Sequence, residues 1–141
     1  METEIKHDIL KAYDLKYSKI EFWEEDLVYI EIYPNTEIDL DAAVKQYNIL
    51  KENHKKDKLY FVLVDSGKFT TITKEARDFS AKPESNDMTY ALAVVIYSLA
   101  QRLIINFHSR FISRQKMKLK AFQNKEDALN WLLELKKAVS N

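Results

Sequence analysis

Two short stretches of apolar sequence constrain the fold of this chain more than any other feature. Leu59 to Val64 (LYFVLV) and Tyr90 to Tyr97 contain no charged residue. A strand that is apolar at every position is typical of the interior of a parallel sheet, which is covered on both faces. The longest apolar run, from Ala91 to Tyr97, is far too short to cross a bilayer. The sequence therefore predicts an α/β fold built around parallel strands, with no insertion into a membrane.

A β-hairpin is predicted ahead of these two strands. Apolar residues alternate over residues 15–23 and again over 27–33, the pattern of strands with one buried face. Glu24, Glu25 and Asp26 lie between them as a short charged turn. A hairpin followed by strand–helix units implies a mixed sheet of about five strands, whose later strands are parallel and joined by right-handed crossovers.

About four helices are predicted from N-terminal capping residues and apolar stripes. The capping residues are Asp39, Thr73, Ser98 and Asn124. The stripe of the third of these helices is Leu99, Leu103, Phe107 and Phe111. Four-residue spacing of this kind predicts a helix face that is buried in the core. Residues 82–87 are expected to form a polar loop, and residues 117–122, with alternating lysines, an edge strand.

The composition favours a single domain over residues 1–141 that lies in the cytoplasm. The chain has no cysteine, which excludes disulfides and thiolate metal sites and is consistent with a reducing compartment. The first residues are charged and resemble no signal peptide. Ile5, Ile9 and Tyr13 recur every four positions, so a short helical extension is predicted over residues 1–14.

No motif in the sequence indicates catalysis or a cofactor. His7, His54 and His108 fall in three different predicted elements, so no metal site is expected. There is no Gly-x-Ser-x-Gly nucleophile elbow. The chain is therefore expected to be no enzyme, and an enzyme without a familiar motif ranks last among the functional hypotheses.

The charges are segregated along the chain although they sum to zero. Residues 21–41 contain eight acids and no lysine or arginine, whereas residues 88–125 contain seven basic residues and no acid. Such asymmetry can mark a surface for a partner, but two segments that offset one another in the fold are the favoured explanation. A balanced charge gives no sign of nucleic-acid binding, so no nucleic-acid partner is expected.

Four stretches of the sequence together resemble a known family. They are residues 38–43 (IDLDAA), 63–79 (LVDSGKFTTITKEARDF), 93–107 (AVVIYSLAQRLIINF) and 120–132 (KAFQNKEDALNWL). Their order and spacing resemble the SpoIIAA-like, or STAS-like, domains, and in particular short stand-alone bacterial proteins of uncharacterised function. The resemblance implies a β/α superhelix with the helices mainly on one face of the sheet. It also implies a regulatory binding module in place of an enzyme.

The resemblance points to one candidate switch. In the anti-sigma-factor antagonists of this fold, a strand that ends in aspartate leads to a helix start where a partner kinase phosphorylates a serine. Asp65 matches the aspartate, but Lys74 and Glu75 occupy the region of the serine, and Thr73 is the nearest hydroxyl. The candidate partner-binding or phospho-switch residues are Asp65, Ser66, Thr71, Thr73 and Lys74. The alternative is that Asp65 and Thr73 are turn and capping residues.

Two functional hypotheses follow from this. The first is a non-enzymatic regulatory module that binds an unknown protein through the ends of the parallel strands and the loop at residues 69–73. The second is a carrier or sensor of a small apolar or anionic ligand between the helices and the sheet. Its cations would be Arg102, Arg110 and Arg114.

A homodimer is also predicted. If the helices cover one face of the sheet, the first two strands expose aromatic residues on the other face. These residues are Tyr17, Trp23, Leu27, Tyr29 and Tyr33. Large exposed apolar patches are rare on monomers, so a second copy of the chain should cover this one. The alternative cover is the predicted N-terminal helix, folded back as a lid.

Overall fold

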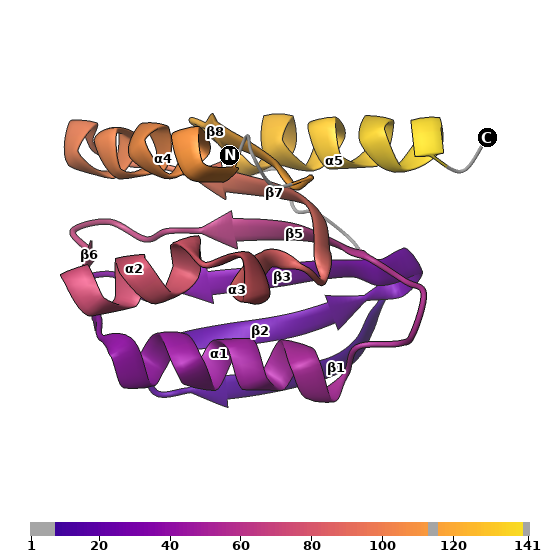
Figure 1. Cartoon of the computed structure of the whole chain (residues 1–141), viewed down its shortest axis with the longest axis horizontal. Coiled ribbons are helices and arrows are strands. Elements are labelled where there is room, and N and C mark those ends of the chain that lie inside the picture. The colour runs from indigo at the N-terminus through magenta and orange to yellow at the C-terminus, as the bar shows by residue number, and fades with distance from the viewer. Residues whose placement is uncertain (1–7, 113–115, 140–141) are drawn as a thin grey trace.

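The structure, a computed structural model, describes residues 8–112 and 116–139, and the side chains of 8–110 and 116–139. Within these residues, six strands form one mixed sheet (Figure 1). Their order across the sheet is β1 (Ile9–Leu15), β2 (Ser18–Trp23), β3 (Leu27–Ile32), β5 (Tyr60–Asp65), β7 (Thr89–Val95) and β8 (Lys118–Phe122). β1, β2 and β3 are antiparallel, and β3, β5, β7 and β8 are parallel. The predicted mixed sheet with parallel later strands is confirmed.

Two further strands and five helices complete the described part of the chain. The small parallel pair is β4 (Glu37–Ile38) with β6 (Thr71–Ile72). The helices are α1 (Leu40–Glu52), α2 (Lys74–Ala81), α3 (Pro83–Asn86), α4 (Leu99–Ile112) and α5 (Lys125–Val139). In Figure 1, α1, α2, α3 and α4 lie in front of the sheet, and the packing of α5 on β5 and β7 places it behind. Helices mainly on one face were predicted, and four of the five described helices follow that prediction.

The two faces of the sheet form two separate cores because side chains alternate along each strand. On the first face, Val28, Ile30 and Val62 pack with Ala42 of α1 and Ala76 of α2. On the second, residues of the same strands pack against α5. This second core contains Leu27, Tyr29, Phe61, Leu63, Ala93, Leu129 and Leu132. Burial on both faces explains why β5 and β7 are apolar at nearly every position.

Two of the predicted helix caps are Asp39 and Asn124, and both accept a hydrogen bond from a main-chain amide of the helix that follows. Asp39 accepts from the Ala42 amide at 2.9 Å, and Asn124 accepts from the Asp127 amide at 2.8 Å. Each side chain satisfies an amide that the first helical turn leaves without a partner. The predicted polar loop at 82–87 is wrong in part, because Pro83–Asn86 forms α3. Pro83 stands at its first turn, where proline needs no amide hydrogen.

The predicted N-terminal helix is wrong for residues 9–14, which belong to β1 at the edge of the sheet. Ile5 lies outside the described residues. A spacing of four places Ile9 and Tyr13 on one face of a helix and equally on one face of a strand. Pairing with β2 decides between the two, and Tyr13 packs its ring edge-on against Phe22. The register shifts between Ile9 and Lys11, so Leu10 is an extra residue opposite Trp23 and Phe22.

Candidate functional site

The carboxyl ends of β5 and β7 are joined by Gln101, a buried residue in the first turn of α4. Its Nε2 donates to the Gly67 carbonyl at 2.9 Å and to Thr70 at 3.0 Å. Its Oε1 accepts from the Tyr97 amide at 2.7 Å and lies 3.0 Å from the Ser66 hydroxyl, whose single proton it shares with the Val95 carbonyl. Gln101 therefore fastens residues 66–70, which we call the rim loop, to the start of α4.

Ser98 and Gln101 have the spacing of a capping box, and half of such a box is present. The Gln101 amide donates to the Ser98 hydroxyl at 3.1 Å, so Ser98 caps α4. The Gln101 side chain, however, bonds to Tyr97 and to the rim loop. The capping pattern was visible in the sequence. The role of Gln101 as a brace, meaning a side chain that holds the rim loop to α4, could not be predicted, because its partner Gly67 is 34 residues away.

The rim loop turns sharply and presents one aromatic side chain to solvent. Gly67 has φ +76°, and a Cβ there would lie 2.4 Å from the Ile32 carbonyl oxygen, so only glycine fits. Phe69 has φ +59° and is 81% exposed. Positive φ is unusual for a bulky residue and strains the backbone. The loop at 69–73, predicted to contact a partner, thus carries an exposed phenylalanine at its tip.

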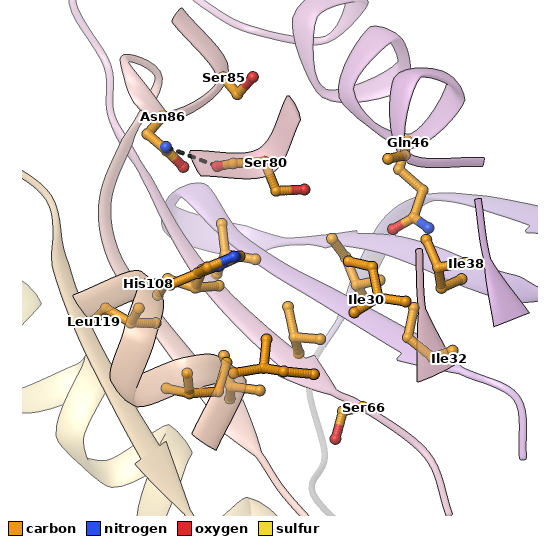
Figure 2. A pocket seen from close by; sticks show the side chains of 18 of the residues that line it. Ile30, Ile32, Ile38, Gln46, Ser66, Ser80, Ser85, Asn86, His108 and Leu119 are labelled. Atoms are coloured by element: carbon orange, nitrogen blue, oxygen red, sulfur yellow. Dashed lines mark hydrogen bonds between the residues drawn. The ribbon is translucent and has the colours of Figure 1, made fainter. Parts of the chain in front are cut away.

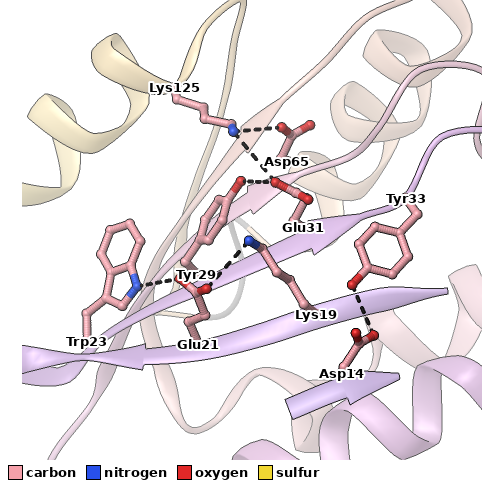
Figure 3. Close-up of polar contacts among 9 residues, drawn as sticks. All are labelled: Asp14, Lys19, Glu21, Trp23, Tyr29, Glu31, Tyr33, Asp65 and Lys125. Carbon is pink, nitrogen blue, oxygen red and sulfur yellow. Dashed lines mark hydrogen bonds and ion pairs between the residues drawn. The ribbon is translucent and has the colours of Figure 1, made fainter. Parts of the chain in front are cut away.

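Asp65 is buried at the end of β5 and is held by neighbouring groups (Figure 3). One of its oxygens accepts from the Gly67 amide at 3.1 Å, and the other lies 3.5 Å from Nζ of Lys125. Lys125 also lies 3.7 Å from Glu31, which accepts a hydrogen bond from Tyr29. Asp65 therefore stabilises the rim loop and the start of α5.

The other candidate switch residues lie in separate surroundings. Ser66 donates to the Val95 carbonyl and is half-buried. Thr73 caps α2, with its hydroxyl accepting from the Ala76 amide at 3.2 Å. Lys74 is exposed and pairs with Asp78, and Thr71 is exposed in β6. Asp65 at the end of β5 and Ser66 at the start of the rim loop are thus neighbours, whereas Thr73 and Lys74 lie at the start of α2.

The buried face of α4 is not the one that the sequence predicted. Leu99 is 72% exposed, Leu103 59% and Phe107 53%, and we call these three residues the outer face of α4. The opposite side of the helix, with Gln101, Ile104 and His108, points to the sheet. Both sides of α4 carry apolar residues, so the spacing alone could not identify the buried side. The side chain of Phe111, the fourth stripe residue, lies outside the described ones.

Two of the three candidate arginines, Arg102 and Arg110, lie on α4. Arg102 is half-buried and Arg110 is exposed, and neither lines the space between the helices and the sheet. Arg114 lies outside the described residues. Arg102 and Arg110 therefore give a positive charge to the neighbourhood of the outer face of α4.

The aromatic face that suggested a homodimer is covered within the chain. Trp23, Leu27 and Tyr29 are buried, and Trp23 stacks on Tyr29 with ring centroids 5.3 Å apart. The Nζ atoms of Lys19 and Lys125 lie over the Tyr29 ring (Figure 3). Burial raises the pKa of the Tyr29 phenol, and its hydrogen bond to Glu31 adds to the effect.

The other two residues of that predicted face also have partners in the chain. Tyr17 lies on the opposite face of the sheet, where its hydroxyl donates to the Ala42 carbonyl at 3.2 Å. Tyr33 donates to Asp14 at 3.0 Å. The predicted exposed aromatic patch is therefore wrong, and the reason is that α5 and the lysine side chains cover this face.

A cavity of about 290 Å³ lies between the sheet and the four helices in front of it. Its floor consists of aliphatic side chains of β3, β5, β7 and β8, among them Ile30, Val62 and Leu119. Its roof comes from α1, α2, α3 and α4. Figure 2 shows polar side chains at its border, with Ser80, Ser85 and Asn86 on one side and Gln46 on another. The cavity therefore has an aliphatic interior with few polar groups, as small-molecule sites usually do.

The cavity is open to solvent along part of its border, so a ligand or water can enter it. Apolar side chains that face water are unfavourable, and a ligand that covers them removes this cost. The apolar lining and the opening together make the cavity a candidate binding site.

His108 is the most buried polar side chain among those that face the cavity. It is 8% exposed, and its ring points from α4 into the cavity (Figure 2). Burial lowers the pKa of His108, the positive charge of Arg77 lowers it further, and Asp78 opposes this. The sequence singled out His108 only as an improbable metal ligand. Its place in a cavity depends on the packing of α4 and could not be read from spacing.

In the part of the chain that the structure describes, no group of three or more histidine, aspartate or glutamate residues is placed to bind a metal ion. In the same residues, no helix is long and apolar enough to span a membrane.

Comparison with known proteins identifies a fold and a family. A crystal structure of an uncharacterized protein of the DUF3478 family from Shewanella loihica PV-4, described as having a SpoIIAA-like fold, matches with a TM-score of 0.58. The two chains are 16% identical, and the match covers 94% of this chain and 99% of that one. The SpoIIAA-like fold implied by the sequence is therefore confirmed. No curated protein matches the chain. The model of the family DUF7793, a domain of unknown function, matches residues 22–136, so the chain belongs to the DUF7793 family.

Proposed function

We propose that this domain is a non-enzymatic regulatory module that binds another protein through the rim loop and the outer face of α4. The observation that carries the proposal is the exposure of Phe69, Leu99 and Leu103, three large apolar side chains near the ends of the parallel strands. Gln101 joins the two segments that present them. Contiguous exposed apolar groups usually mark interaction sites.

The charge around this surface indicates the chemistry of the partner. Residues 88–125, which include α4 and β8, contain seven basic residues and no acid. Arg102 and Arg110 lie on α4 beside the apolar residues. The favoured partner is therefore a protein that offers an apolar contact surrounded by acidic side chains.

The hydrogen bonds of two hydroxyl groups, those of Ser66 and Thr73, favour a binding role over a catalytic one. Ser66 donates to the Val95 carbonyl, and Thr73 caps α2. Both hydroxyl groups therefore have structural partners, which supports a scaffold for binding.

The variant Leu103→Glu tests the surface. It places a charge in the middle of the outer face of α4, where Leu103 is 59% exposed, so the fold should be little affected. The control is Leu59→Glu, the same change at a leucine that is 44% exposed ahead of β5, at the opposite ends of the parallel strands. Both tagged variants and the parent are isolated from the native host, and the proteins that co-purify are compared.

We expect one protein that the parent and Leu59→Glu retain and that Leu103→Glu loses. Identical sets of co-purifying proteins for all three would refute the proposal. Sedimentation of the purified proteins separates a second copy of the chain from a different partner. A parent dimer that Leu103→Glu dissociates would assign the surface to a homodimer.

A carrier of a small apolar ligand is the second candidate function. The observation that favours it is the cavity of about 290 Å³ under α1 and α4. The cavity and the outer face of α4 lie on opposite sides of one helix, so the two roles are compatible.

A further inference from the structure

His108 has hydrogen-bonding capacity that nothing in the described chain uses. It is more than nine-tenths buried and faces the cavity, and no hydrogen bond joins its ring to any residue that the structure describes. Its ring nitrogens are not among the fully buried atoms without a partner in the described chain, so they face the accessible space of the cavity, where a ligand can reach them. A neutral imidazole offers one N–H donor and one nitrogen acceptor. A ligand group that bonds to His108 should therefore be able to donate and to accept a hydrogen bond.

The walls of the cavity indicate the charge of the ligand. Among the described residues, none that lines it is aspartate, glutamate, lysine or arginine. Two of the other polar side chains near the border bond to main-chain carbonyls of the protein. Ser85 donates to the Phe79 carbonyl, and Tyr47 donates to the Glu84 carbonyl. Arg77 and Asp78, whose charges act on His108 with opposite signs, lie outside this lining. A charged ligand would therefore lose its hydration here without an ionic partner in the cavity wall, so the site favours an uncharged molecule.

The volume bounds the size of the ligand. At roughly 30 Å³ for each atom-sized group, 290 Å³ accommodates about ten non-hydrogen atoms. The floor is lined by isoleucine, leucine and valine side chains, including Ile30, Val62 and Leu92. Such a surface matches an aliphatic body better than a polar one.

We propose that the cavity binds an uncharged, mainly aliphatic molecule of about ten non-hydrogen atoms that carries one hydroxyl group, with this hydroxyl hydrogen-bonded to His108. The hydroxyl donates to one ring nitrogen or accepts from the other, while the aliphatic part packs on the floor of the sheet. Such a ligand presupposes the carrier role and does not depend on the protein-binding surface.

The test titrates three probes into the full chain and follows backbone amide signals by NMR. The probes are 1-octanol, octanoate, which has the same chain length with a charged head, and toluene, which has no hydrogen-bonding group. Binding of 1-octanol should shift the amides of Val62 and Leu92 on the cavity floor. Octanoate should bind at least tenfold more weakly, because its charge has no partner in the cavity.

The variant His108→Leu should weaken 1-octanol about tenfold and leave the affinity of toluene unchanged. His108→Gln keeps a donor and an acceptor and should restore most of the lost affinity. The control His54→Leu removes a histidine that bonds to the Lys58 carbonyl outside the cavity, and it should bind like the parent.

The outcomes separate the ligand class from the carrier role. If toluene binds in the cavity but His108→Leu binds 1-octanol as tightly as the parent, the hydroxyl-bearing ligand is refuted and the carrier role stands. If no probe shifts the floor of the cavity up to its solubility limit, both are refuted. Neither result affects the comparison of Leu103→Glu with Leu59→Glu.

Discussion

Replacing Gln101 by alanine should destabilise the domain more than any other single polar substitution at the rim. The alanine removes the hydrogen bonds of the side chain to Gly67, Thr70 and Tyr97. At about 1 kcal/mol for each net bond, the loss is about 3 kcal/mol. This is a large share of the roughly 5–15 kcal/mol that stabilises a domain of this size.

Urea denaturation measures this loss directly. With a slope of about 2 kcal/mol per M, a loss of 3 kcal/mol lowers the midpoint by about 1.5 M. The control is Gln123→Ala, which removes the same side chain at an exposed position between β8 and α5 and should change stability by less than about 0.5 kcal/mol. Equal midpoints for the two variants would refute the role of Gln101 as a brace.

Three further predictions concern the rim and the cavity. Thr73→Ala should cost about 1 kcal/mol in urea denaturation, whereas Thr73→Asp, which also caps α2, should be nearly neutral; an alanine variant as stable as the parent would remove the cap. Gly67→Ala should lower the melting temperature by several degrees, because a Cβ would meet a main-chain oxygen of β3 at 2.4 Å; an unchanged melting temperature would contradict this. Burial and the charge of Arg77 lower the pKa of His108 in the folded chain, although Asp78 opposes them. As the pH falls, His108 is therefore protonated in the unfolded chain at a higher pH than in the folded chain. The free energy of unfolding should therefore decrease below about pH 6.5, and His108→Leu should remove this part of the dependence; parallel curves from pH 5 to 7.5 would contradict it.

The elements that the sequence predicted well are those decided by neighbouring residues. Continuous apolar sequence identified β5 and β7, because burial on both faces removes any alternation. Asp39, Thr73 and Asn124 were correctly predicted as caps, since a cap depends on an amide only three residues away. The same locality explains why β2, β3, β5, β7 and β8, and the helices α1, α2, α4 and α5, were predicted in the correct order.

The elements that it predicted wrongly depend on distant packing. Ile9 and Tyr13 satisfy a helical and a β period together, and only the pairing with β2 selects the strand. Leu99 and Leu103 have the spacing of a buried stripe, but α4 lies on the sheet through Gln101 and Ile104 instead. The cavity was expected only in outline, as a space between helices and sheet. Its walls come from elements throughout the chain. The volume of the cavity and the position of His108 in it therefore depend on how these elements pack together, which the sequence pattern does not show.

The irregular pairing at the start of β1 bears on how readily another chain could extend the sheet at this edge. β1 forms one edge of the sheet, and its first residues, Ile9 and Leu10, are exposed by 52% and 65%. A flat apolar edge would offer a template for another chain to extend the sheet. The extra residue at Leu10 twists the strand and interrupts the regular row of amide and carbonyl groups there. The bulge thus disfavours edge-to-edge aggregation at the part of β1 where the exposed side chains are apolar and carry no charge that would repel another strand.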